Sequence, residues 1–108
     1  MNAVTPDRIM AKLRLALRGD CGCLRTLAEL SAEARSHGLT GAEIDIALAG
    51  RSFEARSDAA ISYACAIKSG ESDTLEAAYA RALRLGLSAS ELARVAEAAR
   101  KILADARS

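Results

Sequence analysis

Two cysteines separated by a single glycine, Cys21 and Cys23, are the residues of this chain best suited to chemistry. They stand directly before a stretch with helical periodicity, so both thiols are predicted to lie at a helix N-terminus. The free backbone N–H groups and the dipole there stabilise a thiolate, which lowers the thiol pKa and raises its reactivity. Arg18 and Arg25 flank the pair and add positive potential. The spacing predicts a redox pair in which one cysteine attacks and the other resolves.

A structural interpretation of the same pair is also open. Cys23 shares a helical face with Leu27 and Leu30, so it suits a small buried apolar residue, and Cys21 is then incidental. A Cys-x-Cys disulfide would close a small, strained ring that is easily reduced. The sequence does not decide whether the two thiols form a disulfide.

The other residues with chemical potential have simpler expected roles. His37 is the only histidine and lies about 21 Å from Cys23 along one helix, so it is expected to be exposed at the helix C-terminus. Cys65 lies in an apolar run and is expected to be a core thiol. Glu43 and Glu91 stand at helix-capping positions. No phosphate loop, nucleophile elbow or zinc spacing occurs, so no cofactor and no metal are predicted.

The composition predicts an all-α chain that forms a single domain over residues 1–108. About half of the residues are apolar, mostly Ala and Leu, and there is one proline. The apolar periodicity and the start and stop signals predict six helices. The first four are expected at about 5–19, 22–37, 40–49 and 52–69. The fifth begins at Asp73, and the sixth begins at Ser88 and carries Arg107 in its last turns.

The fourth and fifth predicted helices carry more specific expectations. The fourth helix is almost wholly apolar over 59–67, which is typical of a helix at the centre of a core. The fifth helix is expected to be capped by Asp73, with Glu76 at its third position. Its inner stripe is predicted to comprise Leu75, Ala78, Tyr79 and Ala82.

The chain contains the same helix-stop and helix-start signal twice, 48 residues apart. In each copy a glycine and a leucine precede a capping box, which is Thr40 with Glu43 in the first and Ser88 with Glu91 in the second. Leu39 with Ile44, and Leu87 with Leu92, occupy the hydrophobic-staple positions. The same offset pairs Arg8 with Arg56, Ala11 with Ala59, Leu13 with Ile61, Ala16 with Ala64, Leu27 with Leu75, and Ala34 with Ala82. The sequence therefore predicts two three-helix units, 5–49 and 53–97, followed by a tail.

Charge and hydropathy limit the partners and the location. The 15 basic and 14 acidic residues give a net charge of +1, which argues against a nucleic-acid surface and an anionic membrane. DNA binding through the 39–48 segment after a tight turn is a third possibility, which the net charge disfavours. No apolar run is long enough to span a membrane, and residues 1–7 lack the apolar core of a signal peptide. Three cysteines suit a reducing compartment, so a cytoplasmic location is expected.

The segment from Ala34 onwards resembles the carboxymuconolactone decarboxylase and alkylhydroperoxidase D (AhpD) family. Ala34, Gly38, Leu39, Thr40 and Glu43 match the second part of that family's core motif. The motif also contains Cys-x-x-Cys, a histidine and an upstream glutamate. Counting back places its first cysteine at Cys23, its second at Thr26, its histidine at Leu30 and its glutamate near Ala11.

The resemblance implies an AhpD-like six-helix bundle that assembles as a trimer or hexamer. It also implies an antioxidant peroxidase activity that depends on redox-active cysteines and on a thiol redox partner. We therefore predict an AhpD-like thiol oxidoreductase that reduces peroxides or disulfides with Cys21 and Cys23 and has an altered or absent proton relay. The alternative is a non-catalytic helical oligomer that serves as a binding or scaffold module.

Overall fold

The computed structural model describes residues 6–19 and 24–106, and in this part of the chain it contains six helices and no strand. The all-α prediction is confirmed. The helices are α1 (Pro6–Arg18), α2 (Leu24–Ser36), α3 (Gly41–Leu48), α4 (Ala55–Ser69), α5 (Ser72–Arg84) and α6 (Ala89–Ala106). None of these helices is long and apolar enough to cross a membrane.

The helices follow the 48-residue repeat closely. Both α2 and α5 contain 13 residues, and they begin at matched positions, Leu24 and Ser72. The third helices also begin at matched positions, Gly41 and Ala89. The halves differ at their ends, because α3 stops at Leu48 whereas α6 continues far beyond the matched residue. The chain uses residues 49–54 instead as a connector between the halves, and α4 therefore begins later than the sequence predicted.

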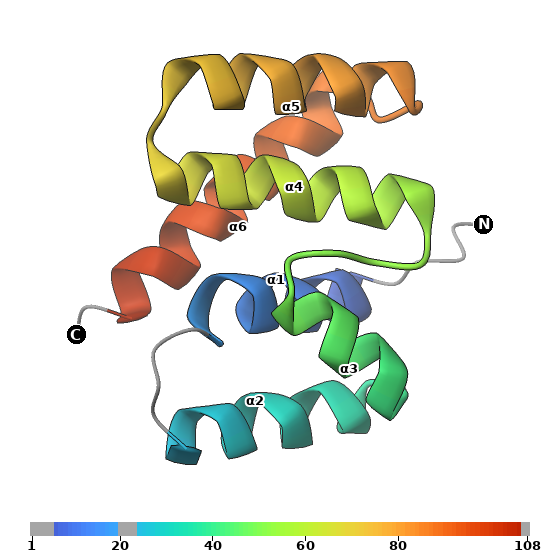
Figure 1. The fold of residues 1–108 in the computed structure, drawn as a ribbon, viewed down its shortest axis with the longest axis vertical. Helices are drawn as coiled ribbons and strands as arrows, with labels where there is room; N and C mark the ends of the chain where they lie inside the picture. The colour runs from blue at the N-terminus through green and yellow to red at the C-terminus, as the bar shows by residue number, and fades with distance from the viewer. Residues whose placement is uncertain (1–5, 20–23, 107–108) are drawn as a thin grey trace.

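The first helix of each half lies in the middle of the molecule (Figure 1). Helices α1 and α4 pack against each other, while α2 and α5 lie at opposite ends of the longest axis, which measures 35 Å. In each half the first helix contacts both of the others. The extra length of α6 lets it contact α1 as well, so this helix joins the halves.

Three apolar clusters make up the core. The first belongs to α1–α3 and contains Ala11, Leu15, Leu30, Ala34, Leu39, Ile44 and Ala47. The second belongs to α4–α6 and contains Ala59, Ala60, Tyr63, Ala82, Leu87, Leu92 and Ala96. The third joins the halves and contains Leu13, Leu17, Ile61, Ala64, Ala99 and Ile102. The predicted central position of α4 is confirmed, because its residues enter both of the last two clusters.

The two predicted capping boxes are both present. In the first, Thr40 N–H donates to Glu43 Oε1 at 2.9 Å and Glu43 N–H donates to Thr40 Oγ1 at 3.2 Å. In the second, the matching distances between Ser88 and Glu91 are 2.9 and 3.1 Å. These reciprocal bonds satisfy backbone donors that have no partner within a helix. The four predicted staple residues are all buried in the first two clusters.

The expected cap of α5 was wrong. The helix starts at Ser72, and its N-cap residue Glu71 makes no side-chain capping bond. Asp73 lies one residue inside the helix, because Leu75 N–H already donates to the Glu71 carbonyl at 3.0 Å. At this position the carboxylate complements the helix dipole without acting as a cap.

Candidate functional site

The predicted redox residues, Cys21 and Cys23, lie outside the described residues. The structure describes the helix that follows them, and α2 begins at Leu24. The first turn of α2 contains no acidic residue and includes Arg25. The positive end of its dipole is therefore not offset by a carboxylate of the same turn.

The positions where the AhpD resemblance would place a proton relay hold buried apolar side chains. Ala11 on α1 is 1% exposed and Leu30 on α2 is 5% exposed, and both belong to the first core cluster. The fold therefore brings these two positions into one cluster, but neither side chain can move a proton. Thr26, at the second cysteine position, is half-buried.

The remaining predicted residues have structural surroundings. His37 follows the end of α2, as expected, but its side chain is half-buried rather than exposed. Arg8 Nη1 donates to the His37 carbonyl at 3.4 Å, which ties this turn to α1. Cys65 is half-buried and packs against the third core cluster, in agreement with a core thiol.

The most connected buried charge is the carboxylate of Asp58, which lies in the first turn of α4. Its side chain is only 5% exposed and receives hydrogen bonds from two arginines and one backbone group. Arg51 Nε donates to Oδ1 at 2.8 Å, and Arg81 Nη2 donates to Oδ2 at 2.9 Å. Ser52 N–H donates to Oδ1 at 2.9 Å. This cluster links the connector, α4 and α5.

The surroundings of Asp58 keep it ionised. Burial opposes its ionisation, but the hydrogen bonds from Arg51, Arg81 and the Ser52 backbone outweigh burial. They lower the pKa of the carboxyl from 3.8 to about 2. Near neutral pH the group therefore accepts hydrogen bonds and is unsuited to general acid–base catalysis. The neighbouring Ser57 Oγ is buried and hydrogen-bonds to no described residue, so no base activates it as a nucleophile.

Lys12 is a second buried charge, and it holds the same connector from the other half. Its side chain is 3% exposed, and its Nζ lies 3.2 Å from Ser52 Oγ and 3.1 Å from Glu54 Oε1. Ser52 therefore meets Lys12 through its hydroxyl and Asp58 through its backbone N–H. The two buried charges fasten the connector to α1 and α4, which is a structural role.

One further electrostatic contact occurs in both halves. Arg8 pairs with Glu43 at 2.8 Å, and the matched Arg56 pairs with Glu91 at 3.2 Å. Each glutamate also completes a capping box, and the backbone hydrogen bond from Thr40 or Ser88 is the largest cause of its lowered pKa. These carboxylates are engaged in holding a first helix to a third helix.

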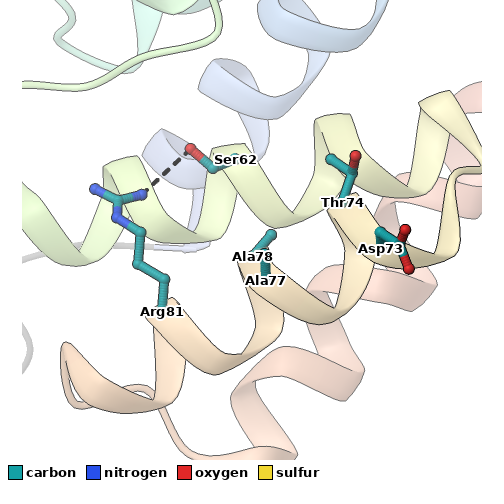
Figure 2. A pocket seen from close by; sticks show the side chains of 6 residues that line it. All are labelled: Ser62, Asp73, Thr74, Ala77, Ala78 and Arg81. Carbon is teal, nitrogen blue, oxygen red and sulfur yellow. Dashed lines mark hydrogen bonds between the residues drawn. The ribbon is translucent and has the colours of Figure 1, made fainter.

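A shallow groove runs between α4 and α5 (Figure 2). It is lined by Ser62, Asp73, Thr74, Ala77, Ala78 and Arg81. At one end Arg81 Nη1 donates to Ser62 Oγ at 3.4 Å, and at the other end lies the exposed Asp73. Small side chains form the middle, so the groove suits a flat or helical surface better than an enclosed small ligand. No group of His, Cys, Asp or Glu side chains within the described ranges could hold a metal ion.

Sequence reasoning missed the roles of Lys12 and Asp58. The signal for Lys12 was a charged residue placed directly between the apolar residues Ala11 and Leu13. The signal for Asp58 was its spacing of three residues from Ile61, on the buried side of the helix predicted to lie at the centre of the core. A charge on a buried face indicates a partner, but the partner residues Arg51 and Arg81 are far enough apart in the chain that spacing alone does not identify them.

Comparisons with protein-family models, with curated proteins and with solved structures find no match to this chain.

Proposed function

We propose that this chain is a non-catalytic helical oligomer that serves as a binding or scaffold module on an AhpD-like frame. The observation that carries the proposal is the pair Ala11 and Leu30. They lie together in one apolar cluster at the two positions where the resemblance would require a glutamate and a histidine. Without a positioned acid or base, proton transfer loses on the order of 10²–10⁴-fold in rate.

The state of the buried charges supports the same proposal. Asp58 is ionised and receives hydrogen bonds from Arg51, Arg81 and Ser52, and Lys12 contacts the connector. These groups stabilise the packing of the helices. We therefore place the proposed binding role on the surface of the protein.

Several large apolar side chains are exposed and suit a binding surface. Phe53 is 66% exposed, and Leu83 and Leu85 at the end of α5 are 44% and 37% exposed. Large apolar side chains that lie near one another on a surface are typical of interaction sites. Leu83 lies in the last turn of α5 and Leu85 directly follows this helix. Helix α5 lies at one end of the molecule (Figure 1).

Peroxide turnover tests the proposal. We expect the full chain, supplied with a dithiol reductant, to consume hydrogen peroxide no faster than the Cys21→Ser/Cys23→Ser double variant. A Cys65→Ser variant serves as the control for incidental thiol oxidation. Turnover that the double substitution abolishes and the control preserves would contradict a non-catalytic role.

A thiol oxidoreductase is the second candidate, and the first turn of α2 favours it. The lack of an acidic residue in that turn leaves the helix dipole available to stabilise a thiolate in the residues just before it. In the reaction, a thiolate of Cys21 or Cys23 attacks a peroxide oxygen, and cleavage of the O–O bond yields a sulfenic acid and an alcohol or water. The other thiol then displaces water to form a disulfide, which an external thiol partner reduces.

Thiol labelling distinguishes the candidates. A redox pair predicts that Cys21 and Cys23 react with a thiol reagent faster than a model thiol at neutral pH, and that dimedone traps a sulfenic acid on one of them after peroxide treatment. Ordinary or slow labelling of both cysteines, with no dimedone adduct, would exclude the oxidoreductase.

A further inference from the structure

The outward face of α5 has no partner within the molecule. Helix α5 contacts only α4 and α6, and it directs Leu75, Ala78, Tyr79 and Ala82 towards them. On the opposite face, four exposed residues follow one another at spacings of four, three and four. They are Asp73, Ala77, Ala80 and Arg84, and we call them the α5 seam. This spacing is that of the contact positions in a pair of packed helices.

Within the described part of the chain, the two charged residues of the α5 seam form no ion pair. One turn along the helix from Asp73 stands Ala77, and one turn back from Arg84 stands Ala80. Asp73 and Arg84 are separated by about 16 Å along the helix, so they cannot meet each other.

The α5 seam is complementary to itself in the antiparallel direction. When a second copy of α5 is laid against it with the opposite polarity, Asp73 faces the partner's Arg84 at one end, and the reverse pair forms at the other. In the middle, Ala77 faces the partner's Ala80. We propose that the α5 seam is an isologous interface through which two copies of this chain associate.

The shape of this face suits close packing of two helices. Alanine side chains in the middle allow the two helix axes to approach closely, because interaxial distance depends on the side chains at the contact. The shallow groove beside the seam is lined by Ser62, Ala78 and Arg81, and it can receive one flank of the second helix (Figure 2). The exposed Leu83 stands on the other flank and adds apolar area.

The matched helix α2 lacks this complementarity. Its corresponding residues are Arg25, Glu29, Ala32 and Ser36, and Arg25 pairs with Glu29 in the same helix at 3.3 Å. An antiparallel copy of α2 would place Arg25 opposite a serine and Glu29 opposite an alanine. An acid near the start and a base near the end of α5 also suit the helix dipole. The exposed alanines between them, and the absence of an oppositely charged residue three or four positions from Asp73 or Arg84 within α5, are what point to a partner helix.

The inference identifies a second copy of this chain as the partner of the proposed binding module. It rests on the proposed function only in assigning the association a binding or scaffold role. Association does not require reactive thiols. The peroxide assay and the association assay therefore test independent properties, and either prediction can be contradicted without the other. A seam of one short helix on each side is small for a stable interface. We therefore expect a dimer, or an assembly built from dimers, that dissociates on dilution.

Sedimentation equilibrium of the full chain tests the interface. A thiol reductant is present to prevent cysteine cross-links. The mass should rise with concentration from the monomer value of 11.3 kDa to the dimer value, or to the value of an assembly with a larger even number of chains. Ala80→Trp should block close approach and keep the protein monomeric. The matched Ala32→Trp on α2 should associate like the unaltered chain. A monomer at every concentration, a trimer, or equal effects of the two substitutions would overturn the proposal.

Charge exchange separates the interface from the helix dipole. Asp73→Arg and Arg84→Asp should each weaken association by about tenfold or more, because each places like charges opposite each other. The double variant Asp73→Arg/Arg84→Asp should restore association, although its charges oppose the dipole of α5. Failure of the double variant to regain association, with helix content retained by circular dichroism, would overturn the proposal.

Discussion

In the first half of the molecule, Arg14 on α1 pairs with Glu33 on α2 at 2.8 Å. In the second half, the matched residues are Ser62 on α4 and Arg81 on α5. The position of the acid Glu33 is therefore occupied by a base, Arg81. Arg81 hydrogen-bonds weakly to Ser62 and turns mainly to Asp58, which replaces Met10 of the first half. The same helix pair is thus joined by a half-exposed contact in one half and by a buried carboxylate in the other.

The difference teaches which features specify the scaffold. The halves share helix starts, capping boxes, staples and small residues at close contacts, such as Ala34 and Ala82, which are both 0% exposed. The charges between the first and second helices are not shared. Helix start and stop signals and apolar packing therefore define the three-helix unit. The ion pair between the first and third helices is retained in both halves, whereas the electrostatic contacts between the first and second helices differ.

Removing core volume at matched positions should have the largest effect. Leu13→Ala and Ile61→Ala each open a cavity in the third cluster, where both side chains are at most 1% exposed. Each should lower the free energy of unfolding by about 3 kcal/mol. Urea denaturation followed by circular dichroism measures this, with exposed Leu83→Ala as the control. Two separate transitions in either variant would show that the halves do not unfold together.

Breaking the buried carboxylate cluster should come next. Asp58→Asn leaves Arg51 and Arg81 without their anion and should lower the free energy of unfolding by about 2 kcal/mol, because both arginines are partly exposed to water. The counterpart Glu33→Gln breaks the half-exposed pair with Arg14 and should cost no more than about 1 kcal/mol. Equal losses in the two variants, measured by urea denaturation, would contradict a special role for the second half.

Acid should weaken the second half selectively. The pKa of Asp58 is lowered in the folded state, so its stabilisation is fully present above the unfolded pKa of 3.8 and is lost as pH falls towards about 2. The loss amounts to roughly 2 kcal/mol. Glu43 and Glu91 also have lowered pKa values and add losses of the same sign. Stability against pH should therefore be flatter in Asp58→Asn, and an identical slope would contradict this assignment.

Removing either capping hydroxyl should have the smallest effect, and an equal one in both halves. Thr40→Ala and Ser88→Ala each remove a side-chain acceptor for a glutamate N–H, so each should cost about 1 kcal/mol. Thr40→Ser and Ser88→Thr keep the acceptor and should be close to neutral. A loss confined to one half, measured by thermal unfolding, would show that the two caps are not equivalent.

Much of the fold could be predicted because its signals are local. A left-handed glycine such as Gly38 or Gly86, followed by a capping box, determines where a third helix begins within a few residues of sequence. Helical periodicity then identified the buried faces. The start of α4 was predicted too early because the connector is held by Lys12 and Asp58, and contacts between distant residues leave no periodic signal.

The functional residues were less predictable for the same reason. Cys21 and Cys23 were selected by residue type and spacing, and they fall outside the described residues, so that prediction stands untested. The contact of Asp58 with Arg81 depends on how α5 packs against α4. The inner stripe of α5 was predicted correctly from its periodicity. The α5 seam could be recognised only in the structure, which shows that Ala77 and Ala80 on the outer face stay exposed.

A pair of double-mutant cycles tests the contrast between the halves most directly. For Asp58→Asn with Arg81→Gln, the coupling energy from urea denaturation should reach at least about 1.5 kcal/mol, because the Asp58 carboxylate is only 5% exposed. For Glu33→Gln with Arg14→Gln, it should stay below about 0.5 kcal/mol, because that pair is half-exposed. Equal coupling energies in the two cycles would contradict the account in which one scaffold carries two different electrostatic links.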